Sequence, residues 1–499
     1  MKYYRIQENS RFIGRKPEWS RLAQIHSQNV SSIIVIHGRR RVGKTELIEQ
    51  FFRKENVLKF EGLQFRTKPE SPKKQQQRQI EECLRLLGQY TSLENIYKNV
   101  VCKNWSEFFE LLSPHVSHKP TVLYFEELQW LSAFDEEFLA RLKPFWDNSW
   151  RHNNGLRVVF SGSSPSFLVR QFMSDKALYN RSTQIIGLGP FSLNEIDLFL
   201  GKAGFKEKII AASCVGGIPE YLKQISKQPS ILDSLYRESF SKYGFLLEEF
   251  SKIFVSSFSD HSHYKDTIKF LCAERFMSRN ELVAKLSPNS TLGGNFSKML
   301  EDLEASGFIE SYSPLHLSEG RNLTRYCIRD EYLNFYQNFI RPIEKEIRNG
   351  AFEKNHKLAL NINKFNAVMG LSFERWCRRN HRLIAQILKF DSIEYLSGAF
   401  FNRAISAEIP SFQIDLVFLR KDHKVIISEI KFGEIPRNIK SEISKKMELF
   451  LIHNPKFKNH TVETLLISAE TSLNSQETTD AFDHVIHLED LFRAARLES

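Results

Sequence analysis

The stretch SSIIVIHGRRRVGKTELIEQFF, residues 31–52, decides the fold of the first half of this chain. Its first apolar run, Ile33–Ile36, has the length and the β-branched composition of a buried strand. Gly38–Thr45 then match GxxxxGK[ST], and the apolar residues that follow recur at helical spacing: Leu47, Ile48, Phe51 and Phe52. A strand, a glycine-bearing loop and a helix in this order predict an α/β domain with a parallel sheet.

The loop carries the groups that a bound polyphosphate needs. Its glycines let backbone N–H groups curl around phosphates, and the helix N-terminus adds positive potential. Lys44 is expected to reach the β- and γ-phosphates, and the Thr45 hydroxyl is expected to bind Mg²⁺. ATP and Mg²⁺ are therefore the expected ligands, and the flanking strand and helix disfavour a chance Gly-Lys-Thr loop. The expected phosphate-binding residues are Gly38, Arg39, Arg40, Arg41, Val42, Gly43, Lys44 and Thr45.

A second apolar run, Val122–Phe125, ends in two acids. Glu126 is expected in the Mg²⁺ shell, and Glu127 is expected to polarise the attacking water. Most such sites have aspartate at the first of these two acidic positions. The extra methylene of Glu126 is compatible with metal binding and leaves the rate of hydrolysis open. A solvated acidic strand end is the weaker alternative.

Two further positions are candidates for contact with the γ-phosphate. A third apolar strand, Arg157–Phe160, is followed by Ser163 and Ser164, either of which is placed to sense that phosphate; a plain turn is an equally good interpretation. Arg181 lies just ahead of another strand pattern and is expected to act on the γ-phosphate in cis or in trans. An ordinary surface arginine is an equal alternative at that position.

Six segments occur in order in the first half of the chain: FIGRKPEW, GRRRVGKTEL, YFEELQWL, FSGSSPSFL, LYNRS and GGIPEYL. Together they resemble the archaeal-type P-loop ATPases of the AAA+/STAND group, over roughly residues 10–340. The resemblance implies a helical lid that contains GGIPEYL, with Pro219 at the position that senses nucleotide near the base. Glu126 departs from this family, which usually has aspartate there.

Residues 266–315 have the pattern of three short helices followed by a β-wing, which is typical of a winged helix. In the third of these helices Lys298 is the single base among three acids: Glu301, Asp302 and Glu304. An acidic helix is unsuited to a DNA groove. We therefore favour a winged helix used for packing within the ATPase over one that reads bases.

Charged residues interrupt the apolar hairpin pattern QIDLVFLRKDHKVIISEIKFGE, residues 413–434. A hairpin symmetric about Asp422 places Asp415 opposite Glu429, and Lys431 then lies on the same face as Glu429. Two buried carboxylates need partners or a metal. We therefore expect Mg²⁺ to be bound by Asp415 and Glu429, with Lys431 orienting a water molecule.

This Asp…Glu-x-Lys hairpin resembles the PD-(D/E)XK nuclease fold over about residues 365–499. In that fold an upstream helix often adds another acid, and Glu374 in GLSFERWCRRN is the candidate. The resemblance implies a catalytic set of Glu374, Asp415, Glu429 and Lys431. A retained fold used for binding or packing, with its charges paired internally, is the alternative.

The composition indicates a basic protein without membrane or secretion features. The net charge of +11 favours anionic partners, of which nucleic acid, DNA more than RNA, is the commonest; a merely basic surface is the alternative. The six cysteines lack metal-ligand spacing. No signal peptide and no apolar run of membrane length is evident, so a cytoplasmic protein without a membrane partner is expected.

The expected architecture is a multidomain α/β protein. Residues 1–200 are expected to form the P-loop parallel-sheet ATPase core, 201–260 the helical lid, 261–345 the winged helix and 346–499 a restriction-endonuclease-like α/β domain. The expected function is Mg²⁺-dependent hydrolysis of ATP, with a C-terminal domain that binds DNA or RNA and whose cleavage activity is an open question. A signalling or scaffolding switch with an inactive C-terminal binding domain is the alternative, and a homo-oligomer is compatible with both.

Overall fold

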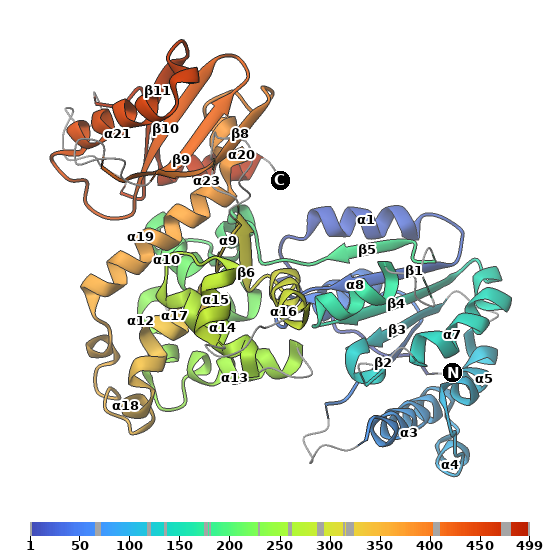
Figure 1. Cartoon of the computed structure of the whole chain (residues 1–499). Helices are drawn as coiled ribbons and strands as arrows, with labels where there is room; N and C mark the ends of the chain where they lie inside the picture. Colours follow the sequence, from blue (N-terminus) through green and yellow to red (C-terminus); the bar gives the residue numbers. More distant parts are fainter. Residues whose placement is uncertain are drawn as a thin grey trace. The chain divides into compact units, whose positions relative to one another are not determined.

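The computed structural model divides the chain into two compact units (Figure 1). Unit 1 consists of Met1–Pro190, Ser251–Ser262 and Gly294–Gly307. Unit 2 consists of Phe191–Phe250, His263–Gly293 and Phe308–Ser499. The residues that the structure describes are 2–64, 71–116, 121–133, 137–173, 178, 181–227, 230–257, 262–286, 294–312, 315, 324–402, 410–470 and 481–497.

Unit 1 is built on a five-stranded parallel sheet in the order β2-β3-β4-β1-β5. Every residue of β3 and β4 is buried, as expected for parallel strands that are covered on both faces. This sheet confirms the parallel-sheet core predicted from residues 31–52. The strands are β1 (Ser32–His37), β2 (Val57–Glu61), β3 (Thr121–Glu126), β4 (Leu156–Gly162) and β5 (Gln184–Gly187).

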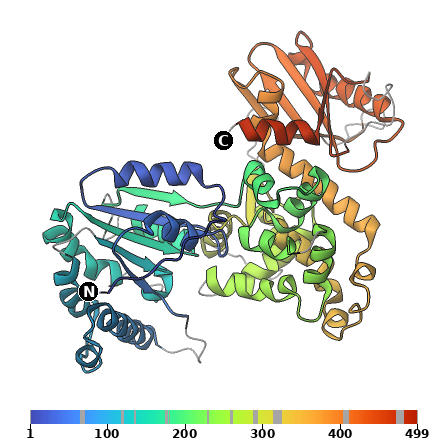
Figure 2. The ribbon, with the colours of Figure 1, turned by 180° about the vertical axis from the view of Figure 1, so that it is seen from behind.

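Helices cover both faces of this sheet (Figures 1 and 2). On one face the rings of Phe60, Phe125 and Phe160 stack at successive centroid distances of 5.8 and 5.4 Å within a large apolar cluster. On the other face lies α2, whose Glu49 pairs with Lys59 of β2. The helices of unit 1 are α1 (Lys16–His26), α2 (Lys44–Phe52), α3 (Pro72–Thr91), α4 (Glu94–Tyr97), α5 (Trp105–Val116), α6 (Leu128–Leu131), α7 (Glu137–Asn148), η1 (Trp150–His152), α8 (Pro165–Met173) and α16 (Gly294–Ala305).

Unit 2 begins with helices and a small antiparallel sheet. Its strands β6 (Ile309–Tyr312) and β7 (Arg325–Ile328) pair with each other, and Met277 bridges to Tyr326. Helices and a hairpin occur where the winged-helix pattern predicts them, but α16 groups with unit 1, so the winged helix stays a prediction. The helices up to the C-terminal sheet are α9 (Leu193–Leu200), α10 (Phe205–Val215), α11 (Pro219–Ile225), α12 (Ile231–Phe240), α13 (Phe245–Ser257, whose last turns group with unit 1), α14 (Ser262–Ala273), α15 (Arg279–Leu286), α17 (Glu331–Phe335), the π-helical turn η2 (Tyr336–Ile340), η3 (Arg341–Ile343), α18 (Glu344–Arg348), η4 (His356–Ala359), α19 (Ile362–Arg379) and α20 (His381–Ile387).

A second five-stranded sheet, in the order β12-β11-β10-β9-β8, forms the C-terminal part of unit 2. Strands β8, β9 and β10 are antiparallel, whereas β10, β11 and β12 are parallel. Helices α19 and α21 pack against it. The elements are β8 (Tyr395–Asn402), β9 (Phe412–Arg420), β10 (Lys424–Lys431), α21 (Ile439–His453), η5 (Pro455–Phe457), β11 (Thr461–Ser468), β12 (His484–His487) and α23 (Leu488–Leu497).

The chain is thus a multidomain α/β protein with a parallel sheet core. The two units divide the chain at other positions than the four predicted domains, whose boundaries remain predictions. Within the described ranges, no helix combines the length and the apolar character needed to cross a membrane.

Candidate functional site

The phosphate-binding loop follows the carboxyl end of β1 and leads directly into α2. Its backbone is left-handed at Arg41 and Gly43, where φ is 71° and 92°. A Cβ atom at Gly38 would lie 2.2 Å from the carbonyl oxygen of Leu188, so only glycine fits there. The loop therefore curls in front of the N-terminus of α2, which is the arrangement that binds phosphate groups.

The Lys44 side chain lies along this loop and is buried. Its Nζ donates to the carbonyl oxygens of Gly38, at 2.9 Å, and Arg39, at 3.0 Å. Burial lowers the pKa of Lys44, and the carboxylates of Glu127 and Glu126 oppose that shift. The ammonium group thus lies among the loop carbonyls, within the field of both acids that end the β3 segment.

The end of the loop and the end of β3 meet through Thr45 and Glu126. The Thr45 hydroxyl donates to Glu126 Oε1, and Glu126 Oε2 lies 2.6 Å from Lys59 Nζ. A hydroxyl and a carboxylate are hard oxygen donors, and Mg²⁺ in nucleotide sites takes one or two protein ligands with phosphates and waters. Among the described residues no three His, Cys, Asp or Glu side chains form a metal cage. The pair therefore fits Mg²⁺, which when bound neutralises charge on the phosphates.

Glu127 and Ser163 lie together at the carboxyl edge of the sheet. Glu127 Oε2 accepts hydrogen bonds from Ser163 Oγ at 2.7 Å, from the Ser163 N–H at 3.2 Å and from Gln129 Nε2. The Glu127 backbone is left-handed, with φ 52°. The structure thus brings the predicted water-polarising acid and the predicted sensor into direct contact. Ser164, the residue after Ser163, is also buried.

Arg15 and Lys59 also hold this site, although the sequence analysis assigned neither a role. Arg15 Nη2 donates to the carbonyl oxygens of Val42, at 2.7 Å, and Gly189, at 2.9 Å, and so ties the loop to the segment after β5. Two sequence features could have identified these residues. Lys59 is a charged residue inside the apolar run VLKF, and Arg15 belongs to the segment FIGRKPEW.

Arg181 lies near the amino ends of β5 and β1, whereas the phosphate loop follows the carboxyl end of β1. It precedes β5, where the Thr183 N–H donates to the carbonyl of Ile33 near the start of β1. The five residues of β1 from Ile33 to His37 separate that contact from the loop, a span of roughly 17 Å. Its guanidinium pairs with Asp147 of α7, at 2.8 Å for Nε–Oδ1 and 3.0 Å for Nη2–Oδ2. The expectation that Arg181 acts on the γ-phosphate, in cis or in trans, remains a prediction.

Pro219 is the first residue of α11 in unit 2. Gly216 and Gly217 before it are left-handed, with φ of 71° and 65°. A Cβ at Gly217 would lie 2.8 Å from the carbonyl oxygen of Phe191, which explains the glycine. Because Pro219 and the loop belong to different units, its role in sensing nucleotide stays a prediction.

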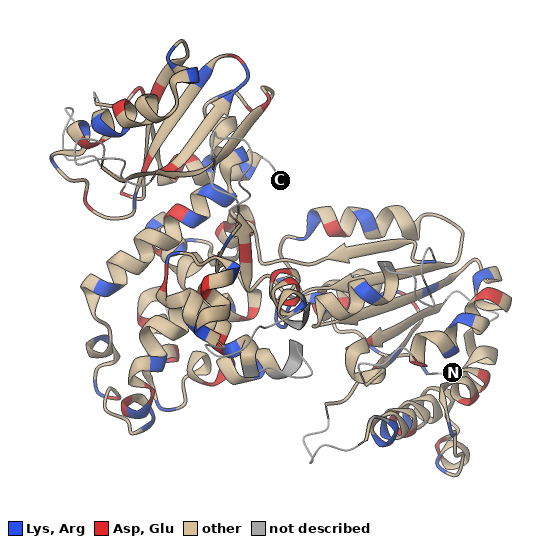
Figure 3. Ribbon diagram, in the orientation of Figure 1, with Lys and Arg blue, Asp and Glu red and all other residues tan. Residues whose placement is uncertain are grey.

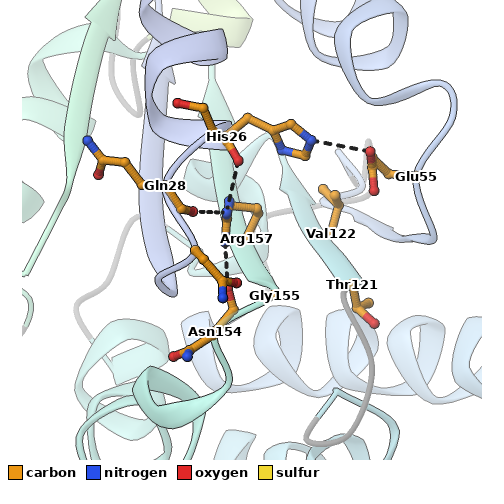
Figure 4. A pocket seen from close by; sticks show the side chains of 10 residues that line it. His26, Gln28, Glu55, Thr121, Val122, Asn154, Gly155 and Arg157 are labelled. Atoms are coloured by element: carbon orange, nitrogen blue, oxygen red, sulfur yellow. Dashed lines mark hydrogen bonds and ion pairs between the residues drawn. The ribbon is translucent and has the colours of Figure 1, made fainter.

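A pocket of about 310 Å³ lies at the amino ends of β3 and β4, the edge opposite the phosphate loop (Figure 4). Arg157 Nη atoms donate there to the carbonyl oxygens of Val30, at 2.6 Å, and Gln28, at 2.7 Å. His26 Nε2 lies 3.3 Å from Glu55 Oε1. The arginine ties the turn after α1 to β4, so these contacts are structural and lie away from the candidate nucleotide site.

The β9–β10 hairpin has the predicted register. Val425 pairs with Leu419 and Ser428 with Leu416, which is symmetric about Asp422. Asp415 Oδ2 accepts from the Ile430 N–H at 3.1 Å, next to Glu429. Glu429 in turn pairs with Lys431, at 2.8 Å, and with Lys446 of α21, at 2.5 Å.

Glu374 of α19 reaches the same cluster and pairs with Arg275. Arg275 Nη2 lies 3.8 Å from Asp415 Oδ1, and Arg378 Nη1 lies 3.8 Å from Glu374 Oε2. Burial raises the pKa of Asp415 to about 7, the carboxylates of Glu374 and Glu429 add to the shift, and Lys446 opposes it.

The four residues predicted for the C-terminal site are thus brought together. Sequence reasoning missed three cations of the cluster: Arg275, Arg378 and Lys446. The carboxylate oxygens suit a hard metal ion, but in this arrangement the chain's own cations engage Glu374 and Glu429. A metal therefore fits only if these ion pairs open.

A P-loop joined to an acid-ended strand in a parallel sheet defines a P-loop ATPase domain. Residues 12–225 match a protein family described as an ATPase domain predominantly from Archaea. An uncharacterized protein of Methanocaldococcus jannaschii is 24 % identical over 435 residues, which cover 85 % of this chain and 88 % of that protein. An uncharacterized ATP-binding protein of the same organism is 39 % identical over 46 residues, or 9 % of this chain and 78 % of that protein.

Two solved structures are similar to parts of the chain. The Walker-type ATPase of Pyrococcus abyssi has a TM-score of 0.47 and 16 % identity, covering 67 % of this chain and 98 % of that one. The Aeropyrum pernix ORC2 protein, in ADPNP–ADP complexes, has a TM-score of 0.43 and 13 % identity, covering 70 % of this chain and 97 % of that one.

Proposed function

We propose that this protein binds ATP with Mg²⁺ at the phosphate loop of unit 1 and hydrolyses it. The hydrogen bond between Thr45 and Glu126 carries this proposal, because it joins the loop hydroxyl to the strand acid at one point. Lys44 would contact the β- and γ-phosphates, and Thr45 and Glu126 would hold the metal. Glu127 would orient the attacking water, with Ser163 holding its carboxylate.

Release of phosphate by the purified full chain tests this function. Turnover should require both ATP and Mg²⁺, and EDTA should abolish it. ATP bound without turnover would instead favour a nucleotide-controlled switch. Failure of the wild-type chain to bind ATP at all would overturn the proposal.

The partner that we propose is nucleic acid, with DNA preferred to RNA. The support is the net charge of +11, which favours contact with phosphate backbones. Basic and acidic residues are both spread over elements of the two units (Figure 3). Binding should therefore depend on many weak phosphate contacts and little on base sequence.

For the C-terminal part we propose a restriction-endonuclease-like domain made of α19 and the sheet β8–β12. Asp415, Glu429 and Lys431 would form its centre, with Glu374 as a helper. If the domain cleaves, Asp415→Ala and Lys431→Ala should each abolish cutting of DNA in Mg²⁺ or Mn²⁺ and leave ATP binding intact. Cutting that persists in either variant would exclude this centre.

A second candidate is a domain of the same fold that binds without cutting, within a nucleotide-dependent signalling or scaffolding switch. The ion pairs of Arg275 with Glu374 and of Lys446 with Glu429 favour it, because they satisfy these carboxylates without a metal. DNA that is bound but left intact by the wild-type chain in either metal would support this candidate.

A further inference from the structure

Lys59 lies in the middle of β2, at the edge of the parallel sheet. In the β2–β3 register it pairs with Tyr124, and Glu61 pairs with Glu126. Alternate residues of a strand share a face, so Lys59 and Glu126 project from the same side of the sheet. The Lys59 side chain is only 11 % exposed, which is unusual for lysine and calls for charged partners.

Two carboxylates and two aromatic rings surround the ammonium group. Lys59 Nζ lies 2.6 Å from Glu126 Oε2 and 2.8 Å from Glu49 Oε1. It also lies 5.0 Å from the ring centre of Tyr4 and 5.5 Å from that of Tyr124. The ammonium group is therefore enclosed by two carboxylates and two ring faces.

Glu126 divides its two carboxylate oxygens between different partners. Oε1 accepts the Thr45 hydroxyl and Oε2 faces Lys59. A glutamate has one methylene more than aspartate and so one more torsion to order. The ion pair with Lys59 restricts this torsion, because it fixes Glu126 Oε2 while Oε1 accepts the hydrogen bond from Thr45.

We propose that Lys59 is a positioning residue of the metal site: it holds Glu126 against Thr45, and its charge sets how tightly the site binds a divalent cation. This inference rests on the proposed nucleotide site. A divalent ion at Glu126 competes with Lys59 for the same carboxylate. Glu49, already in contact, offers the ammonium group a second partner when the metal takes Glu126.

Two variants should move the metal affinity in opposite directions. Lys59→Met removes the competing cation, an effect larger than the lost ordering of one Glu126 torsion, so the dissociation constant for Mn²⁺ should fall by about tenfold. Glu49→Gln removes the second partner of Lys59, which then holds Glu126 more strongly, so that constant should rise by about threefold. Lys59→Arg keeps the charge and should stay near the wild-type value. Opposite shifts would not arise from a purely structural role.

The measurement is titration of Mn²⁺ into the full chain saturated with ADP, with free Mn²⁺ followed by electron paramagnetic resonance. Binding of a fluorescent ADP analogue without metal is measured in parallel. A wild-type chain that fails to bind the analogue would refute the nucleotide site itself. If the analogue binds, unchanged Mn²⁺ affinity, or shifts in one direction for both variants, would overturn the role of Lys59. Should Lys59→Met fail to fold, Glu49→Gln decides alone, and an unchanged constant there refutes the inference.

Discussion

The hydroxyl of Thr45 donates a hydrogen bond to a carboxylate oxygen of Glu126. The two residues are 81 positions apart in the chain, yet they follow the carboxyl ends of strands in the same parallel sheet. Strand order β3-β4-β1 brings both to one edge, with β4 between them. The site is thus a consequence of the sheet topology, and its chemistry is open to direct tests.

Lys44→Ala should weaken ATP binding by at least about 30-fold, which corresponds to roughly 2 kcal/mol for a lost contact with a charged group. The Lys44 ammonium group lies against the carbonyl oxygens of the loop, and alanine has no donor to replace it. Isothermal titration calorimetry with ATP and Mg²⁺ provides the measurement. Lys54→Ala, an exposed position just after α2, is the matched control and should bind normally. Equal affinity in both variants would remove Lys44 from the site.

Glu127→Gln should retain ATP but lower kcat by about 10²- to 10³-fold, because the amide cannot polarise water as a carboxylate does. Ser163→Ala removes the hydroxyl bond to Glu127, at 2.7 Å, and should lower kcat by about tenfold with little change in KM. Ser27→Ala, on the exposed turn after α1, serves as the control. A Glu127→Gln variant as fast as the wild type would show that another group orients the water.

The parts of the two sites that could be predicted are either contiguous in sequence or fixed by simple strand geometry, in a parallel sheet or a tight hairpin. The phosphate loop is contiguous, and a parallel sheet puts Glu126 at the same edge. The β9–β10 register could be predicted because one tight turn, about Asp422, sets every pair in the hairpin. Such features need no knowledge of how distant segments pack.

The residues that were missed come from distant packing. Lys59 contacts Glu126 only because β2 lies beside β3, and the order of strands in a sheet is not written in any one strand. Arg275 meets Glu374 across 99 positions, and Lys446 meets Glu429 from the following helix. Arg181 pairs with Asp147 of α7, a contact between distant segments that no single stretch of the sequence predicts.

A buried ion pair should make the stability of unit 2 depend on pH. Asp197 of α9 pairs with Lys208, at 2.7 Å, and with Arg496 of α23, at 2.7 Å. Burial alone would raise the pKa of Asp197, but Arg496 and Lys208 outweigh it, so the pKa is lowered. The stabilisation is then fully present above the ordinary aspartate pKa of about 4 and is lost as the pH falls through the lowered value.

Asp197→Asn should therefore destabilise this contact by about 2 to 3 kcal/mol at pH 7, because it leaves the buried Lys208 without its carboxylate. The difference from the wild type should shrink below about pH 4, where aspartate is protonated in the unfolded chain. Amide hydrogen exchange of α9 and α23 gives the measurement, and Asp391→Asn, at an exposed position, is the control. A difference that does not depend on pH would argue against the ion pair as the cause.

Binding of nucleic acid should be electrostatic. A protein that contacts roughly six phosphates loses about 10³-fold in affinity between 50 and 200 mM salt. Fluorescence anisotropy of duplexes of unrelated sequence, and of single strands, should show this steep fall with little dependence on sequence. A peptide nucleic acid of matched sequence lacks the phosphates and should bind weakly at every salt concentration. Salt-insensitive binding would contradict this prediction.

Arg275 contacts the carboxylate cluster of the C-terminal sheet. It lies between α14 and α15, and the next residue, Phe276, stacks on Phe401 of β8 with ring centres 5.5 Å apart. The guanidinium of Arg325 lies 5.3 Å from the Phe276 ring centre on a further element. The segment is therefore fixed by packing, and the arginine head contacts Glu374 with Asp415 nearby.

Arg275→Gln removes this cation without removing the packing of Phe276. The carboxylates of Glu374 and Asp415 then lose their nearest compensating charge, so a divalent cation should replace it. We expect the affinity for Mn²⁺, measured without nucleotide in a Thr45→Ala background that lacks the loop hydroxyl, to rise by about tenfold. Arg382→Gln, exposed on α20, should leave the affinity unchanged.

If DNA cutting in Mn²⁺ rises together with metal affinity, the domain is a nuclease that Arg275 restrains. If affinity rises and no cutting follows, the cluster binds metal without cleaving. If the affinity stays at the wild-type value, Arg275 only packs, and the lysines on Glu429 keep the cluster closed.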